Sequence, residues 1–238
     1  TCATALTKEN IQDFSVYGFV ESGEKQGQIF DNTRIYRAGE QFKYDIEQYW
    51  IGGAQYYFTA IAPYQDAKWT YTAKNAAEGT IEFDNSAAAA SQDLIFAYVK
   101  PEKTPADIES KPDPVSFNFR HLLSRVKFSF TNGFAADSNI TLEVSGVKIT
   151  NTAASGSITV SEGTFGDWTT SGDMTIVFGD AALENQSSLM DAGAAAKSDN
   201  YFLIPAARTY KVEFIVTLYQ AGVKFGPYNH AVNVTLDI

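Results

Sequence analysis

Few side chains in this sequence are of the types that carry out catalysis or hold metals. The chain has one cysteine, Cys2, and two histidines, His121 and His230, which lie far apart in the sequence. A cysteine nucleophile needs a base within about 3 Å, and a residue so close to a chain end has little structure to hold its thiol in place. A single histidine between strand segments is usually a hydrogen-bonded structural residue. We therefore predict no catalytic residue, no metal site and no cofactor, and a plain free thiol at Cys2.

Carboxylates are the most abundant groups that could do chemistry, with 28 Asp and Glu in 238 residues. A pair of them could act on glycosides, because such a pair has no fixed spacing in a sequence. The chain has no G-x-S-x-G nucleophile elbow, no glycine-rich phosphate loop and no calcium-loop pattern. Solvated acidic faces are the simpler interpretation. We predict that the protein is not an enzyme and keep a glycoside-acting enzyme as the third hypothesis.

Aromatic side chains are the other candidates for binding. A platform for stacking sugar rings could be built from six of them, Tyr49, Trp50, Tyr56, Tyr57, Trp69 and Trp168. Aromatic residues of β-sandwiches more often belong to the core. Trp168 is the exception, since it ends the loop-like stretch of residues 163–168. It is our candidate ligand-facing residue.

The charge balance excludes some classes of partner. The chain has 18 basic and 28 acidic residues, a net charge of −10. Nucleic acids and anionic membrane surfaces both bind basic patches, so we expect neither as a partner. No run reaches the roughly 18–20 apolar residues that a membrane span needs. A hydrophobic content of 45% is typical of a globular chain, and we expect any targeting segment to have been removed already.

The order of apolar and polar residues predicts strands throughout the first half. Residues 41–47 alternate strictly between large apolar and polar side chains. This period of two is typical of a strand with one buried and one solvated face. Residues 56–62 and 94–99 are apolar on both sides, which predicts central strands covered on both faces. Less regular strands are expected near residues 14–20 and 81–83.

A change of composition separates the two halves of the chain. Four of the seven prolines fall between residues 100 and 115, among charged residues. Proline has no N–H to donate to a ladder, so this stretch is no interior strand. We interpret it as a linker or a long crossing loop, and we predict two domains, residues 1–105 and 106–238.

The second half is also predicted to consist of strands. Residues 115–120 and 126–130 alternate, with a bulge or half-turn between them. Further strands, separated by Ser-Gly turn signals, are expected at 140–144, 147–150, 157–160, 174–178 and 201–204. A hairpin of residues 210–219 and 224–238 closes the chain. Many short strands without amphipathic helices predict an all-β fold of antiparallel sandwiches.

Several segments, taken in order, resemble a known family. They are residues 10–19 (NIQDFSVYGF), Tyr49-Trp50 followed by residues 57–63 (YFTAIAP), residues 93–97 (DLIFA), residues 115–126 (VSFNFRHLLSRV), residues 163–168 and residues 202–205. The most specific is the strand that leads to His121, followed by Leu-Leu-Ser-Arg-Val. Together they resemble the fimbrillin family, the subunits of type V pili.

The resemblance implies a fold, a location and a mode of assembly. It implies two transthyretin-like antiparallel β-sandwich domains in tandem. It implies export as a precursor anchored to the membrane through a lipid, trimming after an arginine, and a place in fimbriae associated with the outer membrane. Its partners would be other pilus subunits, joined by strand exchange. The resemblance also implies a further strand after the last hairpin, usually with a G-x-x-Y element, and the given sequence stops at Ile238 without it.

We therefore predict a structural subunit of a cell-surface pilus. The candidate assembly strand is the last one, in which Val232, Val234, Leu236 and Ile238 point to one side. We expect the C-terminal sandwich to lack its final strand and to be completed by another subunit. The alternative is a carbohydrate- or protein-binding adhesin module at the tip or anchor of the same fibre, with a host or bacterial surface ligand. A row of exposed aromatic residues would favour the adhesin.

Overall fold

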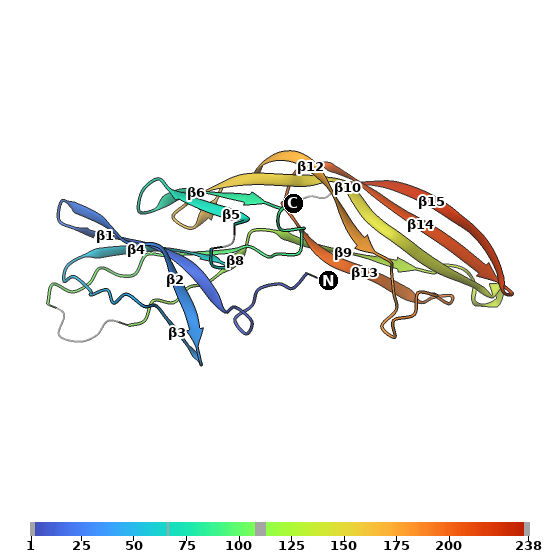
Figure 1. The fold of residues 1–238 in the computed structure, drawn as a ribbon, viewed down its shortest axis with the longest axis horizontal. Helices are drawn as coiled ribbons and strands as arrows, with labels where there is room; N and C mark the ends of the chain where they lie inside the picture. The colour runs from blue at the N-terminus through green and yellow to red at the C-terminus, as the bar shows by residue number, and fades with distance from the viewer. Residues whose placement is uncertain (1–2, 66, 108–112, 236–238) are drawn as a thin grey trace.

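The computed structural model describes residues 3–65, 67–107 and 113–235, and this part of the chain is all β. It contains fifteen strands in three antiparallel sheets and a short 3-10 turn at Ala136–Ser138, with no α-helix among the described residues. The molecule is elongated, with the first strands at one end and the last strands at the other (Figure 1). The prediction of an all-β antiparallel fold is confirmed.

The first sheet has six strands in the order β3-β2-β1-β4-β7-β8. Their bounds are β1 Asp13–Ser22, β2 Lys25–Ala38, β3 Gln41–Lys43, β4 Gln55–Ala62, β7 Ile95–Val99 and β8 Arg120–His121. Seven of the eight residues of β4 are buried. A strand that is apolar on both faces takes a central position, because there both of its faces are covered.

The second sheet has seven strands and runs along most of the molecule. Its path is β15-β14-β10-β6-β5, and β11 and β12 also pair with β10. The bounds are β5 Trp69–Ala73, β6 Glu78–Asp84, β10 Ile140–Ser161, β11 Thr164–Phe165, β12 Thr169–Gly179, β14 Thr209–Gln220 and β15 Val223–Thr235. The third sheet has two strands, β9 Ser124–Thr131 and β13 Ala195–Leu203.

Strand β10 joins the two ends of the molecule. Its first part pairs with β14, from Ile140 to Ile149, and its last part pairs with β6, from Ser155 to Ser161. In Figure 1 it is the long yellow strand. The prediction of three separate strands here is wrong, because neither Ser-Gly pair is a turn between strands. The left-handed φ of Gly146, +60°, instead falls where the pairing with β14 shifts its register, as in a β-bulge.

Three apolar cores hold the sheets together. The first lies between the six-stranded sheet and β5, β6 and the end of β10, and includes Phe83, Phe96 and Phe202. The second lies on the opposite face of the six-stranded sheet, and the third lies between β9–β13 and β10, β12 and β14. The first core contains residues from both sides of position 105, so the observed packing crosses the predicted domain boundary.

Two predicted strands are mostly loops that cover the second core. In residues 41–47 only Gln41–Lys43 pair, and in residues 115–120 only Arg120 is in a ladder. The alternation is real, because Val115, Phe117 and Phe119 pack on the second core. An extended chain alternates its side chains whether or not its backbone has a partner. The pattern of residues 115–119 therefore predicted correctly which side chains face the core, and it predicted the ladder wrongly.

The start of the proline-rich stretch is a long loop fixed to the first half. Gly53 donates a backbone hydrogen bond to the carbonyl of Pro105, at 2.9 Å. The buried hydroxyl of Thr104 accepts from the N–H of Ala54, at 2.8 Å, and donates to the carbonyl of Ile51, at 2.6 Å. Residues 101–107 are therefore part of the body around the second core and not a free linker.

Candidate assembly site

The two layers around the third core are unequal in width. In one layer stand β9 and β13, and in the other stand β15, β14, β10 and β12. Phe128 of β9 packs on Phe178 of β12, with ring centroids 4.9 Å apart, and Phe130 of β9 packs on Phe214 of β14, at 5.1 Å. Strand β9 therefore packs on β12 and β14. It is the last strand of the narrow layer on the side of β14.

Strand β15, at the far edge of the wide layer, is left uncovered. Four of its large apolar residues are about half exposed, Val223 (55%), Phe225 (44%), Tyr228 (48%) and Val232 (48%). The register places Val232 opposite Val212 and Tyr228 opposite Val216 in β14, residues that belong to or pack on the third core. The uncovered residues therefore face the interior side of the sheet. We call Val223, Phe225, Tyr228, His230 and Val232 the open face.

His230 lies in the middle of the open face. Its ring is stacked on that of Phe214, with centroids 5.3 Å apart and planes at 17°. Phe214 in turn contacts Phe130 of β9. We call the edge of β9 that does not pair with β13 its outer edge. The two contacts place the open face directly beyond this edge.

The outer edge of β9 has no strand beside it in the described part of the chain. There β9 pairs with β13 alone. The backbone N–H and C=O groups of its other edge have no ladder partner among the described residues, and such an edge favours pairing with another strand. An apolar face and an unpaired edge thus lie next to each other at the same end of the molecule.

The structure separates the four residues of the predicted assembly strand. Val232 and Val234 lie in β15; Val232 is on the open face and Val234 packs on the third core. Leu236 and Ile238 lie outside the described residues. The two described valines therefore lie on the face of β15 that is turned to the interior side of the sheet. Sequence reasoning missed β9, because nothing in its own pattern indicates which of its edges is paired.

Trp168, the candidate ligand-facing residue, packs against the first core. Its indole N–H donates to the carbonyl of Leu122, at 3.2 Å. A Cβ atom at Gly156 would lie 3.0 Å from the indole Cε3, so the ring lies close against β10. Of the other five aromatic candidates only Tyr49 is strongly exposed, at 81%. The six residues do not form one exposed platform.

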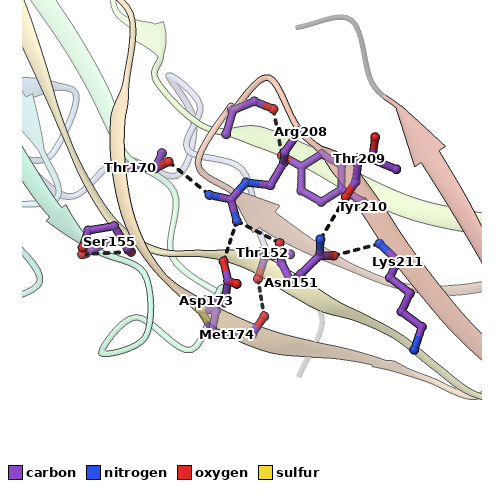
Figure 2. Close-up of polar contacts among 12 residues, drawn as sticks. Asn151, Thr152, Ser155, Thr170, Asp173, Met174, Arg208, Thr209, Tyr210 and Lys211 are labelled. Atoms are coloured by element: carbon purple, nitrogen blue, oxygen red, sulfur yellow. Dashed lines mark hydrogen bonds and ion pairs between the residues drawn. The ribbon is translucent and has the colours of Figure 1, made fainter.

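A polar junction, which sequence reasoning also missed, fixes β10 where it leaves β14 (Figure 2). The guanidinium of Arg208 donates to the carbonyl of Asn151 (3.0 Å), to Asp173 Oδ1 (2.7 Å) and to Thr170 Oγ1 (3.1 Å). The side chain of Asn151 donates to the carbonyl of Thr209 (2.9 Å) and accepts from the N–H of Lys211 (2.8 Å). The side chain of Asn151 thereby replaces backbone ladder hydrogen bonds at the point where β10 and β14 diverge. Asparagine is depleted in strands, so an asparagine inside a long strand is the sequence signal that could have indicated this junction.

The described residues contain no group of three or more His, Cys, Asp and Glu side chains that could hold a metal ion. None of their helices is long and apolar enough to cross a membrane.

Comparisons with known proteins give one family. No curated protein matches the sequence. Among solved structures the chain is similar to the fimbrial anchor protein Mfa2 from Porphyromonas gingivalis, with 10% sequence identity, coverage of 90% of this chain and 71% of that chain, and a TM-score of 0.32. The sequence pattern of the fimbrillin-like family matches residues 1–232. Because this match covers nearly the whole chain, the protein belongs to the fimbrillin-like family.

Proposed function

We propose that the protein is a structural subunit of a cell-surface pilus that receives a strand from a neighbouring subunit at the open face. The fimbrillin-like family consists of structural fimbrial proteins and not of enzymes, and its members assemble with other fimbrial subunits. The finer parts of the proposal are strand exchange, a lipid-anchored precursor and association with the outer membrane. The proposal also includes two transthyretin-like sandwiches in tandem, divided near residue 105.

One observation carries the proposal, namely that the open face lies beside the unpaired edge of β9. A strand added to β9 would satisfy the backbone groups of that edge. Its alternate side chains would cover the open face. Each large apolar side chain that becomes fully buried contributes about 1.5–3 kcal/mol. Several such residues outweigh the cost of ordering one short strand, so the joint is expected to be long-lived.

The test compares two exposed valines. Val232 on the open face is 48% exposed, and Val177 on β12 is 56% exposed. Val232→Asn is expected to reduce incorporation of the subunit into surface fibres, as measured by immunogold labelling of the producing cells. Val177→Asn is the matched control and should assemble normally. Thermal unfolding checks that both variants fold. Normal assembly of a folded Val232→Asn variant would contradict the proposal.

An adhesin module is the second candidate, and a different surface favours it. After β3 the chain exposes Ile46 (67%), Tyr49 (81%) and Ile51 (46%) within six residues. Exposed aromatic and aliphatic side chains of this kind suit a sugar or protein ligand. Tyr49→Ala should then lower binding to glycan arrays or to target cells without changing fibre assembly. Unchanged binding in this variant would contradict the adhesin hypothesis at this surface.

A further inference from the structure

The solvent side of β9 is basic in a protein that is acidic as a whole. Val126, Phe128 and Phe130 of β9 pack on the third core, and the alternating residues Arg125 and Lys127 are exposed on the other side. Strands β9 and β13 together contain three basic residues and one acidic residue, whereas the chain carries 18 basic and 28 acidic residues. The new strand would lie next to this local excess of positive charge.

Among the residues that the structure describes, neither basic residue of β9 has an acidic partner. In the described part of the chain, no salt bridge includes Arg125 or Lys127. The Nε–H of Arg125 donates to Oδ1 of Asn200, at 2.8 Å, which is a neutral acceptor. By contrast, Lys148 and Lys211 on the wide layer both contact Glu213, at 3.1 and 2.6 Å.

The geometry of an added strand brings its outward side chains to these two residues. If a strand pairs with the free edge of β9, its side chains alternate in the same way as those of β9. One set points toward the open face, and the other set stands beside Arg125 and Lys127 on the solvent side. Directly opposite residues in neighbouring strands are about 4.5–5.5 Å apart at Cβ, where opposite charges attract and like charges repel.

We propose that the strand received at the open face comes from another fimbrial subunit and is acidic on its outward side, so that Arg125 and Lys127 select it by charge. This inference rests on the proposed function and adds the chemistry of the partner. The partner strand has apolar residues at every second position and Asp or Glu between them. The charge pair contributes specificity, while the buried apolar residues contribute most of the affinity.

The experiment uses two fluorescent nine-residue peptides that share the same alternating apolar residues. One has Glu and the other Lys at the outward positions, and binding to the 238-residue chain is followed by fluorescence anisotropy. We expect the Glu peptide to bind about tenfold more tightly, because its two charge pairs with Arg125 and Lys127 attract where those of the Lys peptide repel. The net charge of −10 would by itself favour the Lys peptide, so this preference has to come from the local surface. It should shrink as salt is added.

Two double variants separate the local effect from the net charge. Arg125→Glu with Lys127→Glu should reverse the preference of the chain for the Glu peptide. Lys25→Glu with Lys43→Glu makes the same change in net charge at exposed positions of β2 and β3, and should leave the preference in place. If the two double variants changed the preference between the Glu and Lys peptides equally, the proposal that β9 selects the strand by charge would be overturned.

The remaining outcomes distinguish this inference from the proposed function. Binding of both peptides with equal affinity, lost in Val232→Asn, would overturn the charge selection and leave strand exchange intact. Tighter binding of the Lys peptide than of the Glu peptide would likewise overturn the charge selection and leave strand exchange intact. If neither peptide binds the wild-type chain, then the open face does not accept a strand and both proposals fail.

Discussion

The Nδ1 atom of His121 lies 2.8 Å from Oδ2 of Asp93, a carboxylate whose side chain is completely buried. The same carboxylate accepts hydrogen bonds from the backbone N–H groups of Leu6, at 2.8 Å, and Leu94, at 2.9 Å. A buried carboxylate is tolerated when such partners replace its water. His121 belongs to residues 115–126, the most specific segment of the family resemblance. Its position ties β8 and the N-terminal segment to the start of β7, which is a structural role.

Removal of the Asp93 carboxylate should destabilise the protein. Asp93→Ala leaves the N–H groups of Leu6 and Leu94 without their acceptor, and an unsatisfied buried group costs about 1–3 kcal/mol. We expect the free energy of unfolding in urea to fall by about that amount or more. The control is Asp167→Ala, at an exposed position where changes are usually within about 0.5 kcal/mol. Equal stability of the two variants would contradict the role given to Asp93.

The junction of β10 and β14 makes a second prediction. Asn151→Ala removes the two bonds to Thr209 and Lys211, and should lower the free energy of unfolding by about 1–3 kcal/mol. Asn229→Ala, at an exposed position of β15, is the control. Amide hydrogen exchange should also become faster at Lys211, because its N–H loses its acceptor. Unchanged exchange there would show that the junction does not depend on this side chain.

Gly52 should tolerate no side chain. A Cβ atom at this position would lie 2.2 Å from the carbonyl oxygen of Ala106, a backbone atom that cannot turn away. Gly52→Ala should therefore displace the loop fixed by Thr104 and lower the melting temperature, at a cost of about 1–3 kcal/mol. Gly27→Ala is the matched control, because nothing lies within 4 Å of its Cβ position. A melting temperature equal to that of the control would refute the close approach.

Stability at high pH should depend on a group of tyrosines. A hydrogen bond to Glu21, 2.7 Å from the phenol oxygen, raises the pKa of Tyr57 to about 12, and burial raises the pKa of Tyr17 and Tyr98 to about 12. Unfolded tyrosine has a pKa of about 10. Because the folded state holds these phenol protons more tightly, their contribution is complete below about pH 10 and is lost as the pH rises to about 12.

The measurement is the melting temperature between about pH 8 and 12. It should fall across the upper half of this interval, and Tyr57→Phe should make the fall less steep, since one of the three groups no longer titrates. Tyr49→Phe replaces an exposed tyrosine and serves as the control. An equally steep fall in the Tyr57→Phe variant would exclude a contribution from that residue.

Local patterns predicted the strands better than they predicted the pairing. Residues 56–62 became β4 and the last hairpin became β14 and β15, because burial on both faces or a tight turn is encoded nearby in the sequence. Residues 115–119 have the same alternation, but their backbone finds no ladder. The free edge of β9 depends on which distant segment lies beside it. No property of residues 124–131 themselves determines that.

The shared strand β10 has a mechanical consequence for the proposed pilus subunit. Two domains joined by an exposed linker move relative to each other by default. Here one end of β10 is held by eight paired positions with β14 and the other by seven with β6. A pull along the long axis of the molecule acts nearly parallel to these ladders, so their bonds must shear together and cannot open one at a time. The subunit is therefore expected to carry load as a rigid rod, and a fibre built from it would yield first at the joints between subunits.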